Sequence, residues 1–504
     1  MHLARIEAEG ITQSRPSRRP VRSVVQAFRL ASGLALSAAM LTLVTGCGNN
    51  YRPVVTAINP VGPAAQPSKF AVVISDPGTA ASPAPGLVTF VDFAGDTVLI
   101  TANIGVNPYY LILNSGGTTG FTLNGDHTLT SFDVDTSLLT SNINQTTLLP
   151  NANPVSLFPE GASTYVADPG LGAVSQFTSA SGSLALSLQQ NFPIASPYTP
   201  IYTVGVAGAP RAYAISQNTT GANGIVSTIE TTSNTVDSVT IPVGKTPVYG
   251  VMTADARRAF ILNEGDGTET VINAQTNLLD TFTPLNPATG QPLPVTSTIA
   301  DPAAVAPIWA DFAPVRNEMV VANQGDGVHP GSLSVISIPL CSANALPSNP
   351  NCDPSNPIDA VGFGTVQANI PVGVRPVMVG VVQDVNNSRA YVANGGDLSL
   401  PCAVATPVAG VTTGCSVSVI DLNTNTVIAT IPLPTNPTNS NSSVTVVANG
   451  HPNYLAVTSG TPTSKVYVTS GESNFMTVIR TDTDAVDTTV PLQGSGVSVR
   501  VTLP

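Results

Sequence analysis

The sequence predicts an all-β fold, a β-propeller made of four-stranded antiparallel blades. Three observations predict it: a composition dominated by strand and turn residues, a recurrent strand pattern, and a spare strand at the carboxyl end. The pattern recurs at four consecutive intervals of 44 to 49 residues and then at three longer ones, of 60, 71 and 76 residues, that contain insertions. We expect eight blades, with seven as the alternative, in a ring that closes when the carboxyl-terminal strand completes the first blade.

The composition is that of short strands and tight turns. Asp, Glu, Lys and Arg make up 10% of the 504 residues, against roughly 25% in an average soluble protein. Hydrophobic residues make up 42%, and there are 42 glycines and 44 prolines, so the chain can build a core between frequent turns. The net charge of −12, with no basic stripe after the amino-terminal segment, argues against a nucleic-acid partner.

The amino-terminal segment has the pattern of an export signal. Arginines precede an apolar stretch, "LASGLALSAAMLTLV" at 30–44, which is short for a membrane span of roughly 20 residues. The next residues, "VTGC", resemble the bacterial lipobox, and the resemblance implies cleavage after Gly46 and a lipid on Cys47. A plain secretory signal or a short membrane anchor, with Cys47 incidental, are the alternatives.

The lipobox resemblance sets the expected domain boundaries and location. We expect a signal peptide at 1–46, a tether at 47–68 and the propeller at 69–504. The protein would be exported and held in the cell envelope by its lipid, on the periplasmic side or at the cell surface.

The other four cysteines fit an oxidising compartment. They form two local pairs, Cys341 with Cys352 and Cys402 with Cys415, and pairing neighbours is the simplest of three connectivities. The alternative is a thiolate metal site, but no CxxC pair and no nearby histidine in the sequence supports it. We therefore expect two disulfides.

The repeat is clearest in residues 248–285. This segment reads as four short strands at 248–252, 259–263, 269–273 and 278–283, separated by turn residues. The second strand holds an anchor position that recurs along the chain as Val72, Phe121, Tyr165, Tyr213, Phe260, Val320, Tyr391 and Tyr467. Four strands per period of this length are typical of a propeller blade.

The chain ends provide an independent test of the ring. No strand directly before Val72 supplies the first strand of its blade, whereas 497–503 is a strand without a blade. Pairing the two closes the ring and leaves no open sheet edge.

The repeat resembles a known family in its motifs. "AYVANGGD", "SVSVIDLNTNTVIATIPL" at 416–433 and "IPVGKTPVYGVM" at 241–252 are similar to the YVTN-type β-propeller repeat. The resemblance is specific in the later blades, and strand pattern and spacing extend it over 70–200. It implies a propeller fold.

Strand direction predicts which face of the ring is elaborated. With strands A to D numbered from the inside, B–C turns and D–A crossings share one face. Asp266, Asp326 and Asp397 lie in B–C turns, as does the insertion with Cys402 and Cys415. We also place the long segments 284–306 and 433–452 there, as D–A crossings, and the Cys341–Cys352 insertion on the opposite face.

The three aspartates have two interpretations. With Asn263, Asn323 and Asn394 and the glycines that follow, they supply the positive φ and side-chain hydrogen bonds of a short turn. The alternative is a weak Ca²⁺ site formed by Asp266, Asp326 and Asp397, without any DxDxDG loop to support it.

No catalytic motif is present in the sequence. The four histidines lack metal-ligand spacing, and no GxSxG, Walker or Rossmann motif occurs. Glu264, Glu269 and Glu472 are acid–base candidates, but a solvated surface role is expected for each. The innermost strands are mostly apolar, with Tyr249 and Arg500 as exceptions, and Trp309 is expected between blades.

We therefore expect a binding module of the cell envelope rather than an enzyme. Its partner would be an extracytoplasmic protein or a glycan on the B–C face, with no required cofactor. A lactonase-like or hydrolytic propeller and a structural surface component are the alternatives.

Overall fold

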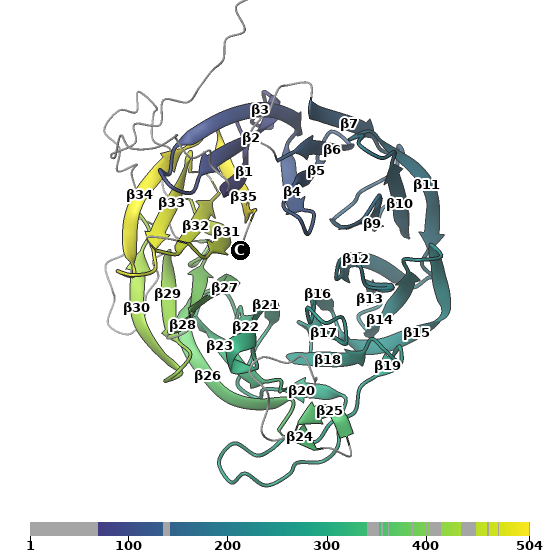
Figure 1. The fold of residues 1–504 in the computed structure, drawn as a ribbon, viewed down its shortest axis with the longest axis vertical. Coiled ribbons are helices and arrows are strands. Elements are labelled where there is room, and N and C mark those ends of the chain that lie inside the picture. Colours follow the sequence, from purple (N-terminus) through teal and green to yellow (C-terminus); the bar gives the residue numbers. More distant parts are fainter. Residues whose placement is uncertain are drawn as a thin grey trace, which may run out of the picture. The chain divides into compact units, whose positions relative to one another are not determined.

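Eight antiparallel blades follow one another around a ring in the computed structural model (Figure 1). All described residues belong to one compact unit, Ala65–Pro504. The structure describes residues 69–134, 142–339, 352–353, 356–360, 362–384, 387–399, 402, 415–434, 450–460, 463–471 and 473–502.

The first four blades each contain four strands. Their strands are, in blade 1, β1 (Phe70–Asp76), β2 (Pro85–Asp92), β3 (Val98–Val106) and β35 (Ser495–Val501); in blade 2, β4 (Pro108–Leu113), β5 (Thr119–Asn124), β6 (Thr128–Asp133) and β7 (Ile143–Thr147); in blade 3, β8 (Ser156–Glu160), β9 (Ser163–Asp168), β10 (Ala173–Ser179) and β11 (Leu186–Pro193); in blade 4, β12 (Tyr198–Gly205), β13 (Arg211–Asn218), β14 (Asn223–Glu230) and β15 (Thr235–Lys245).

The other four blades repeat the pattern with insertions. Their strands are, in blade 5, β16 (Pro247–Met252), β17 (Arg258–Asn263), β18 (Thr268–Asn273), β19 (Leu278–Leu279) and β20 (Thr298–Ala300); in blade 6, β21 (Pro307–Ala313), β22 (Glu318–Asn323), β23 (Pro330–Ser337) and β26 (Thr365–Val374), with the 3₁₀ turn η2 (Pro314–Arg316); in blade 7, β27 (Pro376–Asp384), β28 (Asn387–Asn394), β29 (Ser416–Asp421) and β30 (Thr426–Pro432); in blade 8, β31 (Pro452–Thr458), β32 (Lys465–Ser470), β33 (Phe475–Arg480) and β34 (Ala485–Pro491). A hairpin of β24 (Cys352–Asp353) and β25 (Asn356–Ala360) lies between β23 and β26. The prediction of eight blades is confirmed.

The second strand of each blade explains why the repeat can be read from the sequence. All eight anchor positions, from Val72 in β1 to Tyr467 in β32, lie in this B strand. Every residue of β17, β22 and β32 is buried, because a B strand packs against a neighbouring blade on both faces. The strand therefore has a nearly continuous apolar sequence instead of strict alternation.

The core consists of layers between blades rather than one central cluster. The described residues form eight clusters of buried apolar side chains, and each cluster joins two adjacent blades around the ring. Phe90 of blade 1 and Phe132 of blade 2, for example, meet edge to face at 5.9 Å. Each blade is thus stabilised by its two neighbours, and the ring must close to bury all eight layers.

The ring closes as the sequence predicted. β35 pairs with β1, with Val499 opposite Val73 and Val501 opposite Ala71. Lys465 of blade 8 adds a buried ion pair with Asp96 of blade 1 at 2.5 Å. The innermost strand of the first blade thus comes from the other end of the described chain.

The motif asparagines and glycines fit together within and between blades. The asparagines Asn263, Asn323 and Asn394 end their B strands with ordinary φ and hydrogen-bond hydroxyl groups of strand C, so the positive φ predicted for these turns is not theirs. Gly325 and Gly396, in the turns that follow, have positive φ as predicted. A Cβ atom on Gly244 would lie 2.7 Å from the Asn263 side chain, and one on Gly373 would lie 2.6 Å from Asn394. The glycine that ends "IPVG" is therefore needed because the next blade's asparagine occupies that space.

The motif tyrosines join adjacent blades. Each tyrosine hydroxyl donates to an Asn or Asp at positive φ in the C–D turn of the next blade. The pairs are Tyr165–Asn234 at 2.6 Å, Tyr213–Asn277 at 3.3 Å, Tyr391–Asp484 at 2.8 Å and Tyr467–Asp96 at 3.3 Å. This contact gives the anchor tyrosine a structural role.

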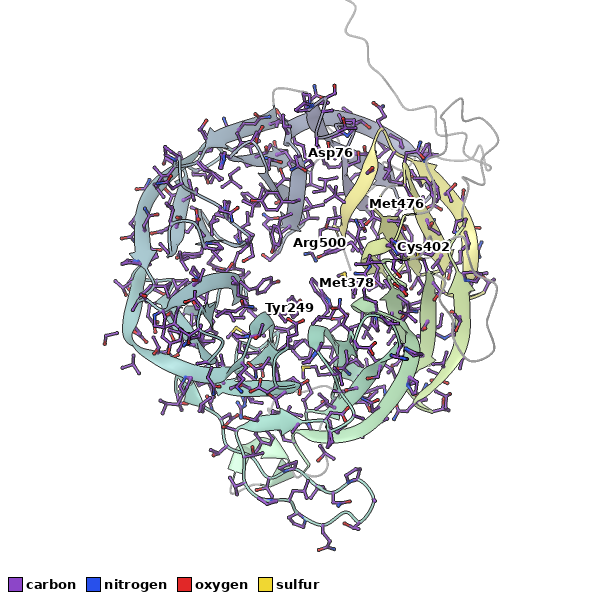
Figure 2. All side chains as sticks on the ribbon, turned by 180° about the vertical axis from the view of Figure 1, so that it is seen from behind. Asp76, Tyr249, Met378, Cys402, Met476 and Arg500 are labelled. Carbon is purple, nitrogen blue, oxygen red and sulfur yellow. A yellow bond between two sulfur atoms is a disulfide. The ribbon has the colours of Figure 1, made fainter. Side chains whose placement is uncertain are left out.

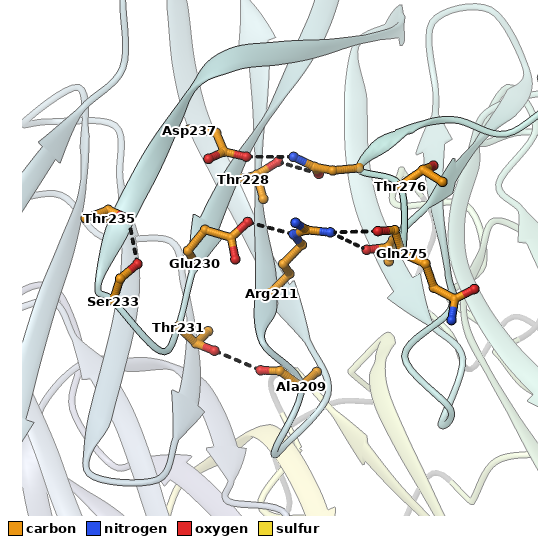
Figure 3. A network of polar contacts seen from close by, with 12 residues as sticks. Ala209, Arg211, Thr228, Glu230, Thr231, Ser233, Thr235, Asp237, Gln275 and Thr276 are labelled. Atoms are coloured by element: carbon orange, nitrogen blue, oxygen red, sulfur yellow. Dashed lines mark hydrogen bonds and ion pairs between the residues drawn. The ribbon is translucent and has the colours of Figure 1, made fainter.

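A basic residue two positions before the tyrosine extends this contact. Arg211 of blade 4 pairs with Glu230 at 2.6 Å and donates to the carbonyl groups of Ala274 and Gln275 of blade 5. Figure 3 shows Arg211 between Glu230 and Gln275. Arg389 and Lys465 reach the next blade in the same way. The pattern K/R-x-Y at the start of strand B therefore indicates an inter-blade contact.

The outer strand of blade 5 differs from the prediction. In place of one strand at 278–283, β19 and β20 each pair with a different end of β18, and residues 280–297 leave between them. This excursion packs on blade 6, where Phe282 meets Phe363 at 5.2 Å and Leu285 N–H donates to Thr365. Our assignment of 284–306 to a D–A crossing on the B–C face was wrong for residues 284–300, because this part packs on blade 6 and ends in β20, which completes the outer strand. Residues 301–306 are a D–A crossing as predicted, since the Val305 carbonyl accepts the N–H of Gly325 in a B–C turn.

A buried ion pair in blade 5 gives a first prediction. Arg258 is 0% exposed and pairs with Asp280, and its guanidinium also lies over the Phe363 ring at 5.8 Å. Asp280→Asn leaves the arginine charge buried without its carboxylate, so we expect the free energy of unfolding to fall by about 3 kcal/mol. Urea unfolding followed by circular dichroism measures it.

The control for this prediction is an exposed ion pair of the same type. Arg480 and Asp482 pair at 2.7 Å with both side chains more than one-third exposed. Asp482→Asn is expected to leave the unfolding midpoint unchanged. Equal effects of the two substitutions would contradict the structural role of the buried pair.

Candidate functional site

The B–C turns and the D–A junctions meet on one face of the ring. Gly265, Gly325 and Gly396 of the B–C turns donate backbone N–H groups to the junction carbonyls of Lys245, Val305 and Val374. We call this the B–C face. The alternating direction of the strands predicted that these two kinds of loop lie on the same face. These hydrogen bonds hold them together there.

Of the three motif aspartates on this face, Asp266 and Asp326 are exposed and Asp397 is half-buried. Asp326 and Asp397 are bound within their own turns, and Asp266 is bound to the adjoining D–A junction. Asp266 accepts the Lys245 N–H at 2.8 Å, Asp326 accepts the His329 N–H at 2.8 Å and faces the His329 ring at 2.6 Å, and Asp397 accepts the Ser399 N–H at 2.8 Å and its hydroxyl at 2.7 Å. These bonds lower the pKa of Asp326, through His329 first, and of Asp397, through Ser399 first. The carboxylates therefore stabilise turns.

The structure does not bring the aspartates together. They belong to three blades, and among the described residues the one group of three potential metal ligands is Cys402, Cys415 and His451. The hypothesis of a calcium site at the aspartates stays a prediction.

Aromatic residues recur near the start of the innermost strands, just below the B–C face. A proline precedes each by two residues, in "NPYY", "TPIY", "TPVY", "APIW", "RPVM" and "HPNY". Between the proline and the large residue the register with strand B shifts in all six blades, which marks a β-bulge. The residues so placed are Tyr110, Tyr202, Tyr249, Trp309, Met378 and Tyr454. A bulge re-aims a side chain, and here it recurs at the inner edge of each sheet.

The aromatic rings touch one another across blades. Tyr249 lies 4.9 Å from Tyr202 and is stacked on Trp309 at 4.2 Å, and Trp309 meets Tyr454 at 5.7 Å. The Arg500 guanidinium lies over the Tyr454 ring at 4.6 Å. All of these residues are half-buried. Together with Tyr110 of blade 2, which has the same bulge position, they form an arc, which we call the aromatic arc. Figure 2 shows Tyr249, Met378 and Arg500 around the central opening.

Arg500 gives the arc a positive charge. It lies in β35, and its Nε donates to the carbonyl of Leu111 in blade 2 at 3.0 Å. No other Lys or Arg occurs in the eight innermost strands that the structure describes. Its guanidinium stays protonated at any physiological pH and has further N–H groups to donate.

The tyrosines of the arc are neutral donors. Burial raises the pKa values of Tyr110, Tyr202, Tyr249 and Tyr454 above the ordinary value of a phenol. Their hydroxyl groups thus stay protonated beside Arg500. The arc combines flat apolar surfaces, phenol donors and one cation.

Asp311 adds a carboxyl group two positions beyond Trp309. It accepts N–H groups from Val381 and Phe312, both at 2.8 Å, and burial raises its pKa to about 6. Our expectation of mostly apolar innermost strands, with two exceptions, was therefore incomplete. The recurrent Pro-x-aromatic pattern was the sequence signal that could have revealed the other aromatic residues of the arc.

The second feature of the B–C face is the disulfide. Cys402 and Cys415 are joined, as predicted. His451 of blade 8 lies against them, with Nδ1 3.3 Å from Cys402 Sγ and 3.5 Å from Cys415 Sγ. His451 is distant from these cysteines in the sequence but lies beside them in the structure, so our expectation of no nearby histidine was wrong.

Other predicted sites fall outside the described residues. Cys47, the predicted lipidation site, lies outside them, and so do Cys341 and Glu472. Cys352 is described, in β24, but its predicted partner Cys341 is not, so the second disulfide stays a prediction. Of the acid–base candidates, Glu264 is half-buried in the turn after β17, whereas Glu269 is 0% exposed, so the surface role expected for Glu269 was wrong. Among the described residues, no helix has the length and apolar character to span a membrane.

The fold and the arc define the class of protein: an eight-bladed β-propeller with an aromatic inner rim. No protein-family model and no curated protein matches the sequence. Among solved structures, apo AztD from Citrobacter koseri aligns with 86% of this chain and 97% of its own, at 12% identity and a TM-score of 0.52.

A second solved structure resembles the chain to the same degree. The dihydro-heme d1 dehydrogenase NirN in complex with DHE aligns with 87% of this chain and 76% of its own, at 11% identity and a TM-score of 0.53. At these identities the likeness is one of fold alone.

Proposed function

We propose that this chain is an exported, lipid-anchored β-propeller that binds a glycan of the cell envelope at its B–C face. The aromatic arc with Arg500 is the observation that supports a glycan over a protein partner. The apolar faces of sugar rings stack on Tyr and Trp side chains, while phenol and guanidinium groups bind sugar hydroxyls and carboxylates. The arginine favours an acidic saccharide, such as one that contains uronic acid or lactyl carboxylates.

The lipid on Cys47 and the likeness to the YVTN-type repeat belong to the same proposal. The signal-like segment before Cys47 and the motif copies in the later blades support them. The aromatic side chains of the arc lie near the starts of the innermost strands, on the side of the B–C face, and the disulfide lies in a B–C connection of the same face.

The only tryptophan in the chain makes this function testable. Trp309 lies in the arc, so its fluorescence reports a ligand there directly. We expect an oligo-uronate to change the emission saturably and Arg500→Gln to weaken its binding at least tenfold, since a charge-assisted hydrogen bond contributes about 1.5–3 kcal/mol. A neutral oligosaccharide of equal length should bind the wild type more weakly, and its affinity should fall less in the Arg500→Gln variant.

Arg480→Gln is the matched control, because it removes an arginine that lies at the end of β33 in an exposed pair. It should leave the affinity unchanged. Emission that responds to no acidic or neutral saccharide would contradict the proposal, and so would equal affinity of the Arg500→Gln variant and the wild type.

One observation supports an enzyme as the second candidate. Asp311, with a pKa raised to about 6, could exchange a proton with a bound ligand near neutral pH. Cleavage of the bound saccharide or of a lactone, lost in Asp311→Asn with binding retained, would favour this hydrolytic alternative.

A further inference from the structure

Two sulfur atoms and one imidazole nitrogen converge on the B–C face outside the aromatic arc. Cys402 and Cys415 come from the B–C connection of blade 7, and His451 comes from the start of blade 8. The three ligand atoms lie within 4.8 Å of one another. We propose that reduction of the Cys402–Cys415 disulfide opens a Cys₂His site for a thiophilic divalent ion such as Zn²⁺, with the fourth position open.

The distances already match such a site. Zn–S bonds of about 2.3 Å and Zn–N bonds of about 2.05 Å at a tetrahedral angle place sulfur about 3.6 Å from nitrogen. The two S–N distances here are 3.3 and 3.5 Å. Only the sulfur–sulfur separation must change, to about 3.8 Å, because the covalent bond between them is replaced by two bonds to the metal.

The surroundings determine which nitrogen of the histidine faces the sulfurs. His451 Nδ1 donates to the Gly395 carbonyl at 2.5 Å, and Pro452 follows it at the start of β31. The same carbonyl faces Cys415 Sγ at 3.5 Å. The nitrogen that faces the sulfurs is therefore Nδ1, and a metal would take the place of its proton.

The charges also favour thiolates at this position. Arg375 donates through Nε to the Gly396 carbonyl at 3.1 Å and through Nη2 to the Gly395 carbonyl at 3.5 Å, so its guanidinium lies beside the same turn. A nearby cation stabilises a thiolate. Two thiolates and one divalent ion are neutral together, which suits cysteines that are only 8% and 5% exposed.

The switch between the two forms is a balanced exchange. A dithiol reductant attacks one sulfur, the Cys402–Cys415 bond breaks, and the reductant leaves as its own disulfide after giving two electrons and two protons. Binding of M²⁺ then releases both thiol protons to water, while the imidazole proton moves from Nδ1 to Nε2. The oxidised form has no thiolate and cannot hold the ion, so metal binding reports the reducing state of the surroundings.

Cobalt(II) is the direct probe for this site, because a Co–thiolate bond gives a sulfur-to-metal charge-transfer absorption. The chain from Cys47 onward is titrated with Co²⁺ before and after reduction and removal of the reductant. We expect one Co²⁺ per chain with this absorption after reduction and none before. His451→Ala should weaken binding at least tenfold, and Cys402→Ser with Cys415→Ser should abolish the absorption.

The second cysteine pair supplies the matched control. Cys341→Ser with Cys352→Ser leaves the proposed ligands intact and should keep full binding. Zn²⁺ should also protect the thiols of Cys402 and Cys415 from alkylation in the unaltered chain, as peptide mass spectrometry measures. No charge-transfer absorption in the reduced chain, loss of its β-sheet circular dichroism on reduction, or binding that survives in the Cys402→Ser, Cys415→Ser variant would each overturn the proposal.

Discussion

Deletion of residues 495–504 should leave a chain that does not form a stable ring. β35 makes six residue pairs with β1, and Val499 is 0% exposed within the layer between blades 8 and 1. Loss of about six hydrogen bonds at about 1 kcal/mol each, together with exposure of two apolar layers, is comparable to the roughly 5–15 kcal/mol of net stability of a typical domain. We expect no cooperative thermal transition and a larger hydrodynamic radius.

Addition of the missing strand tests the same idea in the opposite direction. A synthetic peptide of residues 494–504 should restore part of the cooperative transition of the truncated chain, because β35 pairs with β1 without any covalent link at that edge. A peptide with Val499→Asp is the control and should not restore it. A truncated chain that melts like the full chain would show that the ring does not depend on this closure.

The blade count could be predicted because the second strands are the most constrained part of the fold. Tyr213 and Tyr391, for example, must pack between two blades and reach the next C–D turn, so both the apolar run and the tyrosine recur at blade spacing. The outer strands are less constrained, since one edge is free of sheet partners. That is why the division of the outer strand of blade 5 into β19 and β20 left no clear mark in the sequence.

The candidate sites depend on contacts that spacing alone does not reveal. The aromatic arc requires Tyr249 of blade 5 to lie beside Trp309 of blade 6. In the sequence, each of the two is only an aromatic residue near the start of a strand. His451 is 49 residues from Cys402 and meets it only because consecutive blades are adjacent in the ring. The Pro-x-aromatic repeat is the one local signal of these sites.

Glu269 shows the same limit, since its burial depends on the distant strand β20. In β18 it lies opposite Leu262 on one side and Ile299 on the other, and neither carboxyl oxygen has a hydrogen-bond partner in the described part of the chain. Burial first, and then the negative charge of Asp301, raise its pKa to about 8. The side chain is therefore protonated in the folded protein at neutral pH.

Glu269→Gln should consequently stabilise the protein in alkaline solution. Below pH 4.5, the ordinary pKa of the group, the folded and unfolded chains both hold the proton. Between pH 4.5 and about 8 only the folded chain keeps it, so the free energy of unfolding falls by about 1.4 kcal/mol per pH unit, about 5 kcal/mol in total, and is constant above that range. Because glutamine does not ionise, the free energy of unfolding of the variant does not fall in this way as the pH rises.

The measurement is the difference in unfolding free energy between variant and wild type as a function of pH. Urea unfolding from pH 5 to 9 should show the difference rising in favour of Glu269→Gln and levelling off above pH 8, which separates ionisation from any constant cost of the amide. Glu264→Gln removes a carboxyl group from a half-buried position in the same blade and should follow the wild type. A difference that does not change with pH would mean that Glu269 is ionised in the folded state, because only a proton held by the folded chain alone produces that slope.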